Sequence, residues 1–538
     1  MPARLAIPLV LAWAVIAGVS LATHTLMPVD ETRYATVAWN MWWRGDFLVP
    51  WLNDVPYHHK PPLLFWAIHA GWAVTGVNEW WPRIAPGLFG LAAVFMSWHV
   101  ARRLWPQDEL AARLTPVVLL GCLWWALFAS ATMFDMLVAC FTVLGMIGVV
   151  NAAQGRLLQG FALVGVALGL GLLSKGPTIL LQVLPAAVLA PWWADRRPAP
   201  GWGRWYVAVL LSVLLGAAII LAWAIPAAIR GGPEYTRMIF WGQTANRMVQ
   251  SFAHREPAWW YVALAPVMVF PWLFWPPALR ALARTRRHLD NGLRFCLAWS
   301  VPVFVAFSAI SGKQAHYLLP LLPAFALLLA RMLSRTSGTV SRISQVPVAL
   351  VLVGFGIAIG FAGALAPRFG GAAWISAVPI YGGTAMAAWG LFLLLPARQR
   401  LERAVAVLAG ASIVTVFTAD FAVIRVAADA YDQRPIARYL QSLEAGQVPV
   451  AHLGKYHGQF QFHGRLRRTP EVVDADRIEQ WFAAHPDGRL IAYFRKLPAN
   501  AHPEFTQGFA GRRVAVFDRA GWASAGRPEA DSGRSSDD

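Results

Sequence analysis

The sequence predicts an all-α polytopic membrane protein with about 13 transmembrane helices, followed by a small C-terminal α/β domain. Of its 538 residues, 57% are hydrophobic and only 14% are charged, whereas about a quarter of the residues in a soluble domain are charged. The chain also contains 28 tryptophans, a residue type that gathers at membrane–water interfaces. This composition, together with repeated long apolar runs, indicates an integral membrane protein.

Thirteen apolar runs account for the predicted spans, since a span needs about 20 mainly apolar residues. They cover residues 5–27, 82–101, 114–132, 136–152, 160–174, 178–194, 206–229, 259–279, 293–311, 317–333, 346–366, 373–396 and 403–422. The first run follows Arg4 and is long enough to be retained as a span. Cleavage of a signal peptide after Ala22 is the alternative, because Ser20-Leu21-Ala22 offers the small residues that such a site needs.

Arginines alternate between successive loops, which predicts how the chain is oriented. Short arginine-rich loops stay on the cytoplasmic side of a membrane. The loops that fit this pattern contain Arg102, Arg156, Arg196 with Arg197, Arg284 with Arg286 and Arg287, Arg331, and Arg398. The loops between them are 28–81, 134–135, 174–176, 230–258, 311–316 and 367–372. These loops should face outward, and they carry nearly all of the conspicuous polar residues, so the sequence predicts a functional site on the outer face.

Residues 1–424 form the predicted membrane domain, and their first outward loop, 28–81, is too long for a simple connector. Its Trp-rich stretch 34–43 is amphipathic and predicts a helix lying in the membrane interface. Pro61-Pro62 precedes a second such helix over 63–74. The net charge of +18 sits mostly in the short inner loops, so it indicates membrane topology and no nucleic-acid partner.

The composition changes after residue 423, where long apolar runs stop. Helical patterns at 434–443 and 475–484 alternate with short apolar strands at 448–453, 490–494 and 513–517. This alternation predicts a small α/β domain over 425–523, which lies outside by the parity of the spans. Residues 524–538 are rich in Ser, Gly and Asp, and we predict that this tail is disordered.

Asp30 and Glu31 are the first candidates for chemistry, because two carboxylates follow directly after an apolar span. Charged groups near hydrocarbon cost several kcal/mol unless they are paired or functional. One of the two could simply cap a helix, and the functional alternative is a general base that deprotonates a hydroxyl group. Asp135 stands alone between two apolar runs on the same predicted face. It could orient that base or share a divalent cation with it.

Several cations are predicted to converge on the same face. Lys175 precedes Gly176-Pro177, which should end a helix and expose backbone N–H groups, although a lysine that snorkels to the interface is the structural alternative. Lys60 precedes Pro61-Pro62 in a similar setting. Arg83 and Arg247 lie in or beside the outward loops. A cationic cluster at a membrane surface indicates an anionic ligand, most simply a lipid phosphate.

His58, His59 and His316 are candidate metal ligands on the outer face. They lack a fixed short spacing, which makes them a weak signal for a metal, and histidines placed at the interface are the structural alternative. A divalent metal, zinc or magnesium, held by His59 and His316 therefore remains a minority alternative.

Five motifs occur in a fixed order along the chain. They are Asp30-Glu-Thr-Arg-Tyr, His59-Lys-Pro-Pro-Leu, the isolated Asp135, Ser174-Lys-Gly-Pro and Gly312-Lys-Gln-Ala-His-Tyr-Leu-Leu-Pro. In this combination the sequence resembles the bacterial aminoarabinose transferase and protein-mannosyltransferase-like superfamily. These are GT-C glycosyltransferases with many spans that use polyprenyl-phosphate sugars as donors. The resemblance covers roughly residues 1–425, and members of the superfamily have a similar terminal periplasmic domain.

The resemblance implies roles for individual positions. It makes Asp30 the catalytic carboxylate and Asp135 the second acidic position, with Glu31 as an orienting or capping residue. It places Lys60, Lys175 and Tyr317 at the donor phosphate. The chain departs from the family at His59, where aminoarabinose transferases commonly have a glutamate that helps to bind a metal.

The expected function is the transfer of one sugar from an undecaprenyl-type polyprenyl phosphate to lipid A or another envelope glycan. A single displacement inverts the anomeric carbon, and the absence of a Gly-rich fingerprint indicates no nucleotide cofactor. The expected location is the inner membrane of a bacterium, with the site facing the periplasm. Transfer to proteins, as by protein O-mannosyltransferases, is an alternative. A lipid flippase or transporter is another, but it would show inverted repeats and polar residues at mid-span.

Overall fold

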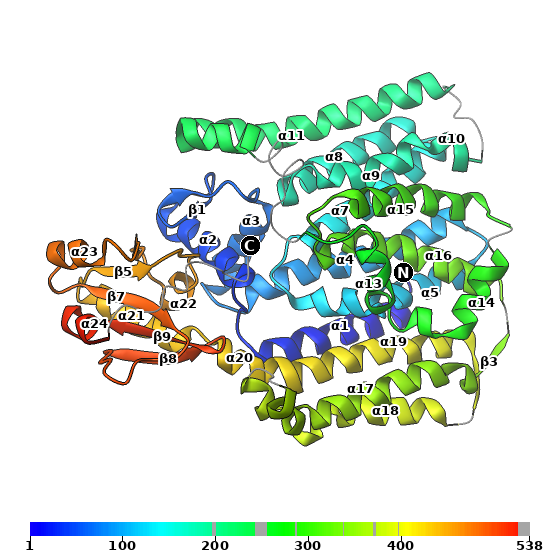
Figure 1. Cartoon of the computed structure of the whole chain (residues 1–538). Coiled ribbons are helices and arrows are strands. Elements are labelled where there is room, and N and C mark those ends of the chain that lie inside the picture. The colour runs from blue at the N-terminus through cyan, green and yellow to red at the C-terminus, as the bar shows by residue number, and fades with distance from the viewer. Residues whose placement is uncertain are drawn as a thin grey trace.

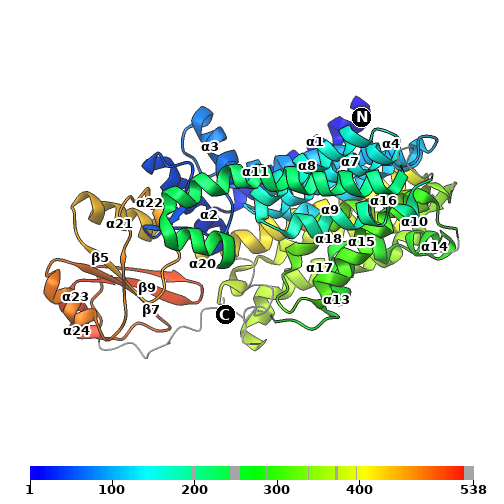
Figure 2. The same cartoon turned by 90° about the horizontal axis from the view of Figure 1, so that it is seen from above.

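The computed structural model of this chain describes residues 1–195, 201–242, 255–285, 288–336, 338–369, 373–395 and 397–525. Arg196, Arg197, Arg247, Arg286 and Arg287 of the predictions above lie outside these ranges, as does the predicted tail beyond residue 525. Long helices run side by side, and a small sheet region lies beyond one end of them (Figure 1). We call that end the Asp30 end and the opposite end, where α14 and β3 lie, the Arg331 end (Figures 1 and 2).

Within the described residues, nine helical segments are long and apolar enough to cross a membrane. They contain α1 (Ala3–Thr23), α4 (Trp81–Leu104), α7 (Asp135–Ala153), α8 (Leu157–Lys175), α11 (Gly201–Arg237), α15 (Asn291–Ala309), η4 with α16 (Ala315–Leu321, Leu322–Ser334), α17 (Val346–Leu365) and α19 (Leu401–Thr418). A tenth is formed if the pair Glu109–Leu120 and Leu123–Ser130, which bends by 56°, is one span. This pair consists of α5 (Glu109–Leu120), α6 (Leu123–Leu127) and η1 (Phe128–Ser130). The predicted class of a multi-span helical membrane protein is confirmed.

The other three predicted spans form shorter helices. Run 178–194 gives α9 (Thr178–Val188) and α10 (Ala190–Trp193); run 259–279 gives α13 (Trp260–Met268), η3 (Trp272–Phe274) and α14 (Pro276–Thr285); run 373–396 gives η7 (Ala373–Ala377), η8 (Ile380–Gly383) and α18 (Thr384–Leu394). Proline lacks a backbone N–H and interrupts a helix. Pro271 and Pro276 lie at the breaks of the second run, so apolar length overestimates continuous helix there.

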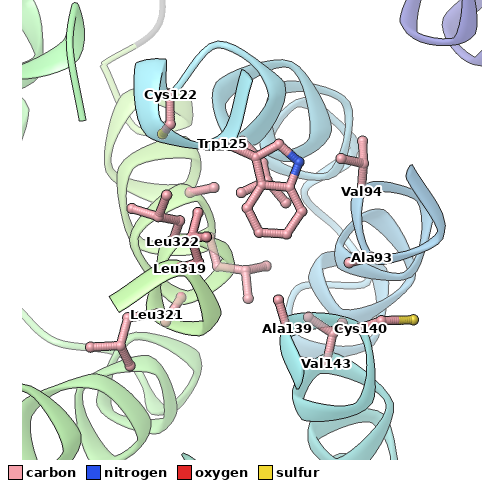
Figure 3. Packing of buried hydrophobic residues seen from close by; sticks show 14 of the residues in the cluster. Ala93, Val94, Cys122, Trp125, Ala139, Cys140, Val143, Leu319, Leu321 and Leu322 are labelled. Carbon is pink, nitrogen blue, oxygen red and sulfur yellow. The ribbon is translucent and has the colours of Figure 1, made fainter. Parts of the chain in front are cut away.

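Close packing at the centre explains why these helices stay together without water. Figure 3 shows Trp125 of α6 among side chains of α4, α7 and η4, including Val94, Val143 and Leu319, all of them at most 1% exposed. Helices in lipid approach most closely through small residues. A Cβ added to Gly148 of α7 would lie 2.6 Å from the carbonyl oxygen of Gly160 in α8.

The outer faces of the bundle are apolar, as expected for a surface that lipid covers. On α11, Leu210, Leu211 and Leu214 are each more than half exposed. On α17, Phe355 and Ile357 are also more than half exposed. A soluble protein rarely leaves so long an apolar stripe uncovered, so these faces agree with a membrane location.

Two further helices lie at the Asp30 end, where the sequence predicts interfacial helices. They are α2 (Asp30–Arg44) and α3 (Leu63–Thr75), joined through the hairpin of β1 (Trp51–Leu52) and β2 (Val55–Pro56). The middle of α2 is fully buried, with Ala35, Val37 and Met41 at 0% exposure. An interfacial helix this deeply buried has protein on more than one side.

The C-terminal region is a small α/β unit, as predicted. Its sheet has the order β6-β5-β7-β9-β8, in which β5 is parallel to β6 and β7, and β9 is antiparallel to β7 and β8. The elements are α20 (Arg425–Tyr431), α21 (Arg434–Ala445), β5 (Val450–Leu453), α22 (Gln461–Gly464), β6 (Glu471–Val473), α23 (Ile478–Ala484), β7 (Arg489–Phe494), β8 (Phe505–Phe509), β9 (Arg512–Phe517) and α24 (Arg519–Ala525). A π-helical segment, η9 (Ala419–Ile424), connects α19 to α20.

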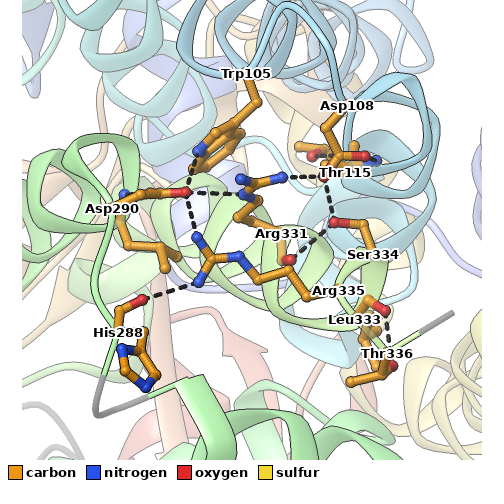
Figure 4. Close-up of polar contacts among 12 residues, drawn as sticks. Trp105, Asp108, Thr115, His288, Asp290, Arg331, Leu333, Ser334, Arg335 and Thr336 are labelled. Atoms are coloured by element: carbon orange, nitrogen blue, oxygen red, sulfur yellow. Dashed lines mark hydrogen bonds and ion pairs between the residues drawn. The ribbon is translucent and has the colours of Figure 1, made fainter.

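A network of charges ties the ends of four helices, α4, α5, α15 and α16, together at the Arg331 end (Figure 4). Asp290 accepts hydrogen bonds from Arg331 Nε at 2.9 Å, Arg335 Nη2 at 2.7 Å and Trp105 Nε1 at 3.1 Å. Arg331 also pairs with Asp108. Burial alone would raise the pKa of Asp108, but the hydrogen bonds from Ser334 and the Ala111 backbone and the charge of Arg331 lower it. Arg331 is thus neutralised within the protein.

Candidate active site at the Asp30 end

A buried ion pair joins the ends of two transmembrane helices. Asp135 is the first residue of α7 and Lys175 is the last residue of α8, which Gly176 ends with a φ of 74°. Lys175 Nζ lies 2.7 Å from Asp135 Oδ1 and 2.9 Å from Oδ2. Asp135 is only 2% exposed. A carboxylate this deeply buried needs a partner, and the ammonium group of Lys175 is the partner that compensates the charge of Asp135.

His316 and Tyr317 complete this side of the site. His316 Nε2 lies 3.9 Å from Asp135 Oδ2, and Lys175 Nζ lies 4.6 Å from the centre of the Tyr317 ring, within range of a cation–π interaction. Lys313, three residues before His316, instead donates to the backbone carbonyls of Glu256 and Ile310 at 2.8 and 2.6 Å. Lys313 therefore anchors the start of η4.

Asp30 is the more accessible carboxylate. It begins α2, its side chain is 41% exposed, and it pairs with Arg33 one turn later. Burial would raise the pKa of Asp30, but the charge of Arg33, hydrogen bonds from Tyr34 and Arg33, and the charge of Lys60 lower it. The neighbouring Tyr34 has its pKa raised by burial and by the charge of Asp30, so it keeps its proton. Asp30 is thus ionised at neutral pH and accepts hydrogen bonds.

The two sides of the site form one electrostatic unit. His316 interacts with the charges of Asp135 and Lys175 and also with those of Asp30 and Lys60. Tyr34 of α2 packs edge-on against Phe134, the residue before Asp135, with ring centres 4.9 Å apart. We call this set, consisting of Asp30, Arg33, Lys60, Asp135, Lys175, His316 and Tyr317, the Asp30–Asp135 cluster.

Glu31 is buried beside the cluster, and its carboxylate binds backbone N–H groups. Its carboxylate oxygens accept hydrogen bonds from Met27 N at 2.8 Å and from Thr132 N at 2.6 Å. These bonds tie the segment before Asp30 to the segment before Asp135. The geometry favours the orienting alternative for Glu31, because both of its oxygens are occupied.

Arg83 is not brought to the cluster, contrary to the prediction that it contacts the phosphate. It is 2% exposed and donates to the carbonyl of His24 at 2.6 Å and to the carbonyl and hydroxyl of Ser20 at 2.9 and 2.6 Å. The last carbonyls of a helix lack partners within that helix. Arg83 therefore supplies hydrogen bonds to the carbonyls at the end of α1. The sequence does not show that these carbonyls need a donor. Arg247, the other predicted phosphate ligand in this group, lies outside the described residues.

The predicted metal ligands do not gather around one point. The centre of the His59 ring lies 4.3 Å from that of His58, with the rings tilted by 32°, and 5.3 Å from that of Tyr57, whereas His316 faces Asp135. In the part of the chain that the structure describes, no group of three or more His, Cys, Asp or Glu residues could hold a metal ion. Both oxygens of Asp135 are bound by Lys175. These donors fit no metal site, so we derive no step through a metal.

The C-terminal unit holds α2 in place, which sequence reasoning did not predict. Thr36 Oγ1 donates to the Gly458 carbonyl at 2.7 Å, Trp39 Nε1 to the Leu466 carbonyl at 2.8 Å, and Asn53 Nδ2 to the Tyr456 carbonyl at 2.6 Å. We call this contact the α2 clamp. The α2 clamp joins positions more than 400 residues apart, and no local pattern reveals such a pairing.

Glu79 connects the C-terminal unit to the segment that leads into Asp30. Its carboxylate accepts from Thr25 Oγ1 at 2.9 Å and lies 3.2 Å from His463 Nδ1. Burial would raise the pKa of Glu79, but the hydrogen bond and charge of His463 and the hydrogen bond of Thr25 lower it to about 2. Glu79 is therefore ionised and fixes Thr25 to the C-terminal unit.

A bundle with this helix order, with carboxylates and lysines gathered at one end beneath a small α/β unit, has the GT-C architecture. The crystal structure of ArnT from Cupriavidus metallidurans bound to undecaprenyl phosphate aligns with a TM-score of 0.73 at 21% identity, over 95% of this chain and 97% of that chain. The apo structure of the same protein aligns with a TM-score of 0.71. The two proteins therefore share a fold.

Sequence comparison points to the same class. A family model described as dolichyl-phosphate-mannose-protein mannosyltransferase matches residues 59–223. An undecaprenyl phosphate-alpha-4-amino-4-deoxy-L-arabinose arabinosyl transferase from Erwinia tasmaniensis is 32% identical over 63% of this chain and 61% of that protein. A protein of the same name from Pseudomonas aeruginosa is 32% identical over 60% of this chain and 59% of that protein. The chain aligns with about three fifths of these relatives, and the resemblance predicted from the motifs is confirmed.

Proposed function

We propose that this protein transfers a sugar from a polyprenyl phosphate, of the undecaprenyl type, to an acceptor in the cell envelope. The observation that carries this proposal is the Asp30–Asp135 cluster, in which an accessible, ionised carboxylate lies among several cations at the end of the helices. A phosphate on a membrane lipid can reach this position, and the cations compensate its charge. The relatives named above are arabinosyl transferases with undecaprenyl phosphate in their names, which supports this choice of donor.

Asp30 is the proposed base or orienting group. It is accessible, and Arg33 and Lys60 favour its ionised form, so it can accept a hydrogen bond from an acceptor hydroxyl. Its lowered pKa makes it a weak base, and so its main contribution is to align the nucleophile with the anomeric carbon. Attack then displaces the lipid phosphate and inverts the anomeric centre in one step.

Lys60 and Lys175 are the proposed stabilisers of the departing phosphate. A lysine ammonium has three N–H donors, and Lys175 directs two of them at Asp135. The third can meet a phosphate oxygen beside Tyr317. Asp135 and its helix fix the Lys175 ammonium in position before the substrate binds. The positive charge of Lys175 therefore acts where negative charge grows in the transition state. The role of Asp135 is therefore to position Lys175.

Lipid A is the proposed acceptor, and the inner membrane of a bacterium, with the cluster facing the periplasm, is the proposed location. The alternation of arginine-rich loops supports this orientation. Transfer to a protein is the second candidate, because the matched family model describes a protein mannosyltransferase. Mass spectrometry of lipid A and of envelope proteins from a deletion strain decides between them: the modified species that disappears identifies the acceptor.

Purified protein tests the reaction directly. Wild type with a polyprenyl-phosphate sugar and extracted lipid A should yield sugar-modified lipid A, and Asp30→Asn should lower kcat by on the order of 100-fold. Asp54→Asn is a matched control, because Asp54 is also an exposed carboxylate paired with an arginine, Arg44, but outside the cluster. Equal rates in all three proteins would rule out the role of Asp30. The absence of transfer from any lipid-linked sugar to any envelope acceptor would contradict the proposed function.

A further inference from the structure

A cleft apart from the Asp30–Asp135 cluster lies at the Asp30 end, between the membrane helices and the C-terminal unit. It has a volume of about 400 Å³, within the range of small-ligand sites. Trp374 of η7 lines it from the membrane side, Asp429 and Asp432 line it at the end of α20, and Phe509 and Arg512 line it from the β8–β9 hairpin. No residue of the Asp30–Asp135 cluster takes part. This cleft is therefore a separate site.

The walls of the cleft are fixed before any ligand binds. Gln507 in β8 accepts from Ile436 N at 3.0 Å and donates to the Asp432 carbonyl at 2.8 Å. Asp432 in turn binds Arg434, with both carboxylate oxygens engaged. Phe509 packs edge-on against Tyr431 with ring centres 6.0 Å apart. A site that is ordered in advance loses less entropy when a ligand binds.

The groups that line the cleft select the chemistry of its occupant. Trp374 and Phe509 offer aromatic faces, on which a ligand with C–H faces can pack. Asp429 is exposed, and its carboxylate accepts hydrogen bonds from hydroxyl or amine groups. Two carboxylates and one guanidinium line the cleft, so it has no excess of positive charge for a phosphate. Aromatic faces beside the exposed carboxylate of Asp429 match a neutral or amine-bearing sugar.

The cleft lies at the same end of the molecule as the Asp30–Asp135 cluster, since α20, β8 and β9 lie at the end where α2 begins (Figure 1). Asp420 in η9 is 3.8 Å from His24, which precedes Asp30 by six residues in the sequence. Asp429 follows Asp420 by nine residues, through η9 and α20. A glycan whose acceptor hydroxyl lies at Asp30 can extend toward the cleft.

We propose that this cleft binds the saccharide part of the acceptor, at a neutral or amine-bearing sugar, while its reacting hydroxyl is held at Asp30. This inference rests on the proposed function for the identity of the acceptor, but the binding of a sugar in the cleft does not depend on any transfer. The two can therefore be tested separately.

Sugar binding is tested first, on the full chain in detergent micelles, by saturation-transfer NMR with chitobiose as the probe. Wild type should transfer saturation to the sugar protons, and Trp374→Ala should lose this signal. Trp374→Phe keeps an aromatic face and should retain part of it. Trp259→Ala is the matched control, since Trp259 is 64% exposed and lies outside the cleft. No signal in wild type, or equal signals in all four proteins, would overturn the proposal.

Kinetics then tests the role of the cleft in transfer. Trp374→Ala and Asp429→Asn should each raise the KM for the glycan acceptor about tenfold, with kcat and the KM for the lipid-linked donor unchanged. Asp476→Asn, which changes an exposed carboxylate between β6 and α23 and outside the cleft, should leave all three constants unchanged. A fall in kcat at constant acceptor KM would refute the binding role. If wild type transfers no sugar at all, the proposed function fails, while the NMR result still decides whether the cleft binds a saccharide.

Discussion

At the scale of single residues, the Asp135–Lys175 pair shows how a buried charge is tolerated next to a membrane. Asp135 is 2% exposed and its two oxygens face a single ammonium. Neither residue could remain charged there alone, because an ion without a partner loses its solvation and gains nothing in return. We therefore expect the effects of removing the two charges on protein stability to be coupled.

We expect Lys175→Met to destabilise the protein by about 3–5 kcal/mol, because it leaves the Asp135 carboxylate buried without a partner. The double variant Asp135→Asn with Lys175→Met should recover much of this loss, since both charges are then removed. Thermal unfolding in detergent measures the effect. If the double variant loses as much stability as Lys175→Met and Asp135→Asn lose in sum, the two residues are not coupled. Transfer activity should stay low in both variants.

The sequence made Asp30, Asp135, Lys60, Lys175, His316 and Tyr317 candidates, and the structure places them in or around one cluster. Asp135 and Lys175 stand between closely spaced apolar runs, and the cost of a polar group near lipid makes such positions visible in a sequence. Arg83 is likewise a charged residue at the edge of an apolar run, yet it donates hydrogen bonds to the carbonyls at the end of α1. Which polar groups the backbone itself requires depends on where helices end in space, and sequence spacing does not give this information.

At the scale of elements, α2 is held between the bundle and the C-terminal unit. The α2 clamp supplies three hydrogen bonds, and Phe462 of α22 stacks on Trp72 of α3 with ring planes 5° apart. Because Asp30 begins α2, the orientation of this helix sets the direction of its first carboxylate.

We predict that Phe462→Ala destabilises the protein by about 3–5 kcal/mol, the usual cost of removing a buried phenyl group, and lowers kcat through the freed α2. Phe361→Ala removes a phenyl group that is 50% exposed on α17 and should change neither quantity appreciably. The midpoint of thermal unfolding and the rate of transfer are the two measurements. Unchanged kcat in a folded Phe462→Ala protein would show that the packing of α22 against α3 does not help to orient Asp30.

The contact of Glu79 with His463 should make the same interface sensitive to acid. The folded-state pKa of Glu79 is about 2, below its ordinary value of 4.5, so its stabilising contribution is present above pH 4.5 and is lost as the pH falls toward 2. The difference in unfolding midpoint between wild type and Glu79→Gln should therefore shrink across this interval. A difference that stays constant from pH 6 to about pH 2.5 would contradict this assignment.

The positions of most helices were predictable from apolar length, because a span must be long enough to cross hydrocarbon. The breaks within 259–279 and 373–396 were harder to predict, because prolines and glycines there divide runs that are apolar throughout. Strands β6 and β8 were also missed. Each is short or carries polar residues, and pairing with longer neighbours in the sheet stabilises them.

At the scale of the whole molecule, the orientation predicted from the arginines can be tested with introduced cysteines. The three native cysteines, Cys122, Cys140 and Cys296, are buried and should not react. In intact cells stripped of their outer membrane, a membrane-impermeant maleimide should label Asp54→Cys but not Arg156→Cys. Lysis should expose both positions. Labelling of Arg156→Cys before lysis would reverse the proposed topology.

The two ends of the molecule use their charges differently. At the Arg331 end, arginines are neutralised by Asp108 and Asp290 within the protein. At the Asp30 end, the carboxylate of Asp30 remains accessible, and the cleft beside Trp374 opens on the same end. Charge at one end thus serves stability and orientation, and charge at the other is available to ligands.

The α2 clamp has a consequence for how this protein tolerates variation. In all three of its hydrogen bonds the donor is a side chain of the membrane region, and the acceptor is a main-chain carbonyl, of Gly458, Leu466 or Tyr456. Every amino acid provides such a carbonyl, whereas few side chains can replace Thr36, Trp39 or Asn53. The loop of the C-terminal unit is therefore free to diverge at Leu466 and Tyr456 as long as its path is kept. Gly458 is the exception, because its φ is 75° and an added Cβ would lie 2.7 Å from Leu52 Cδ1.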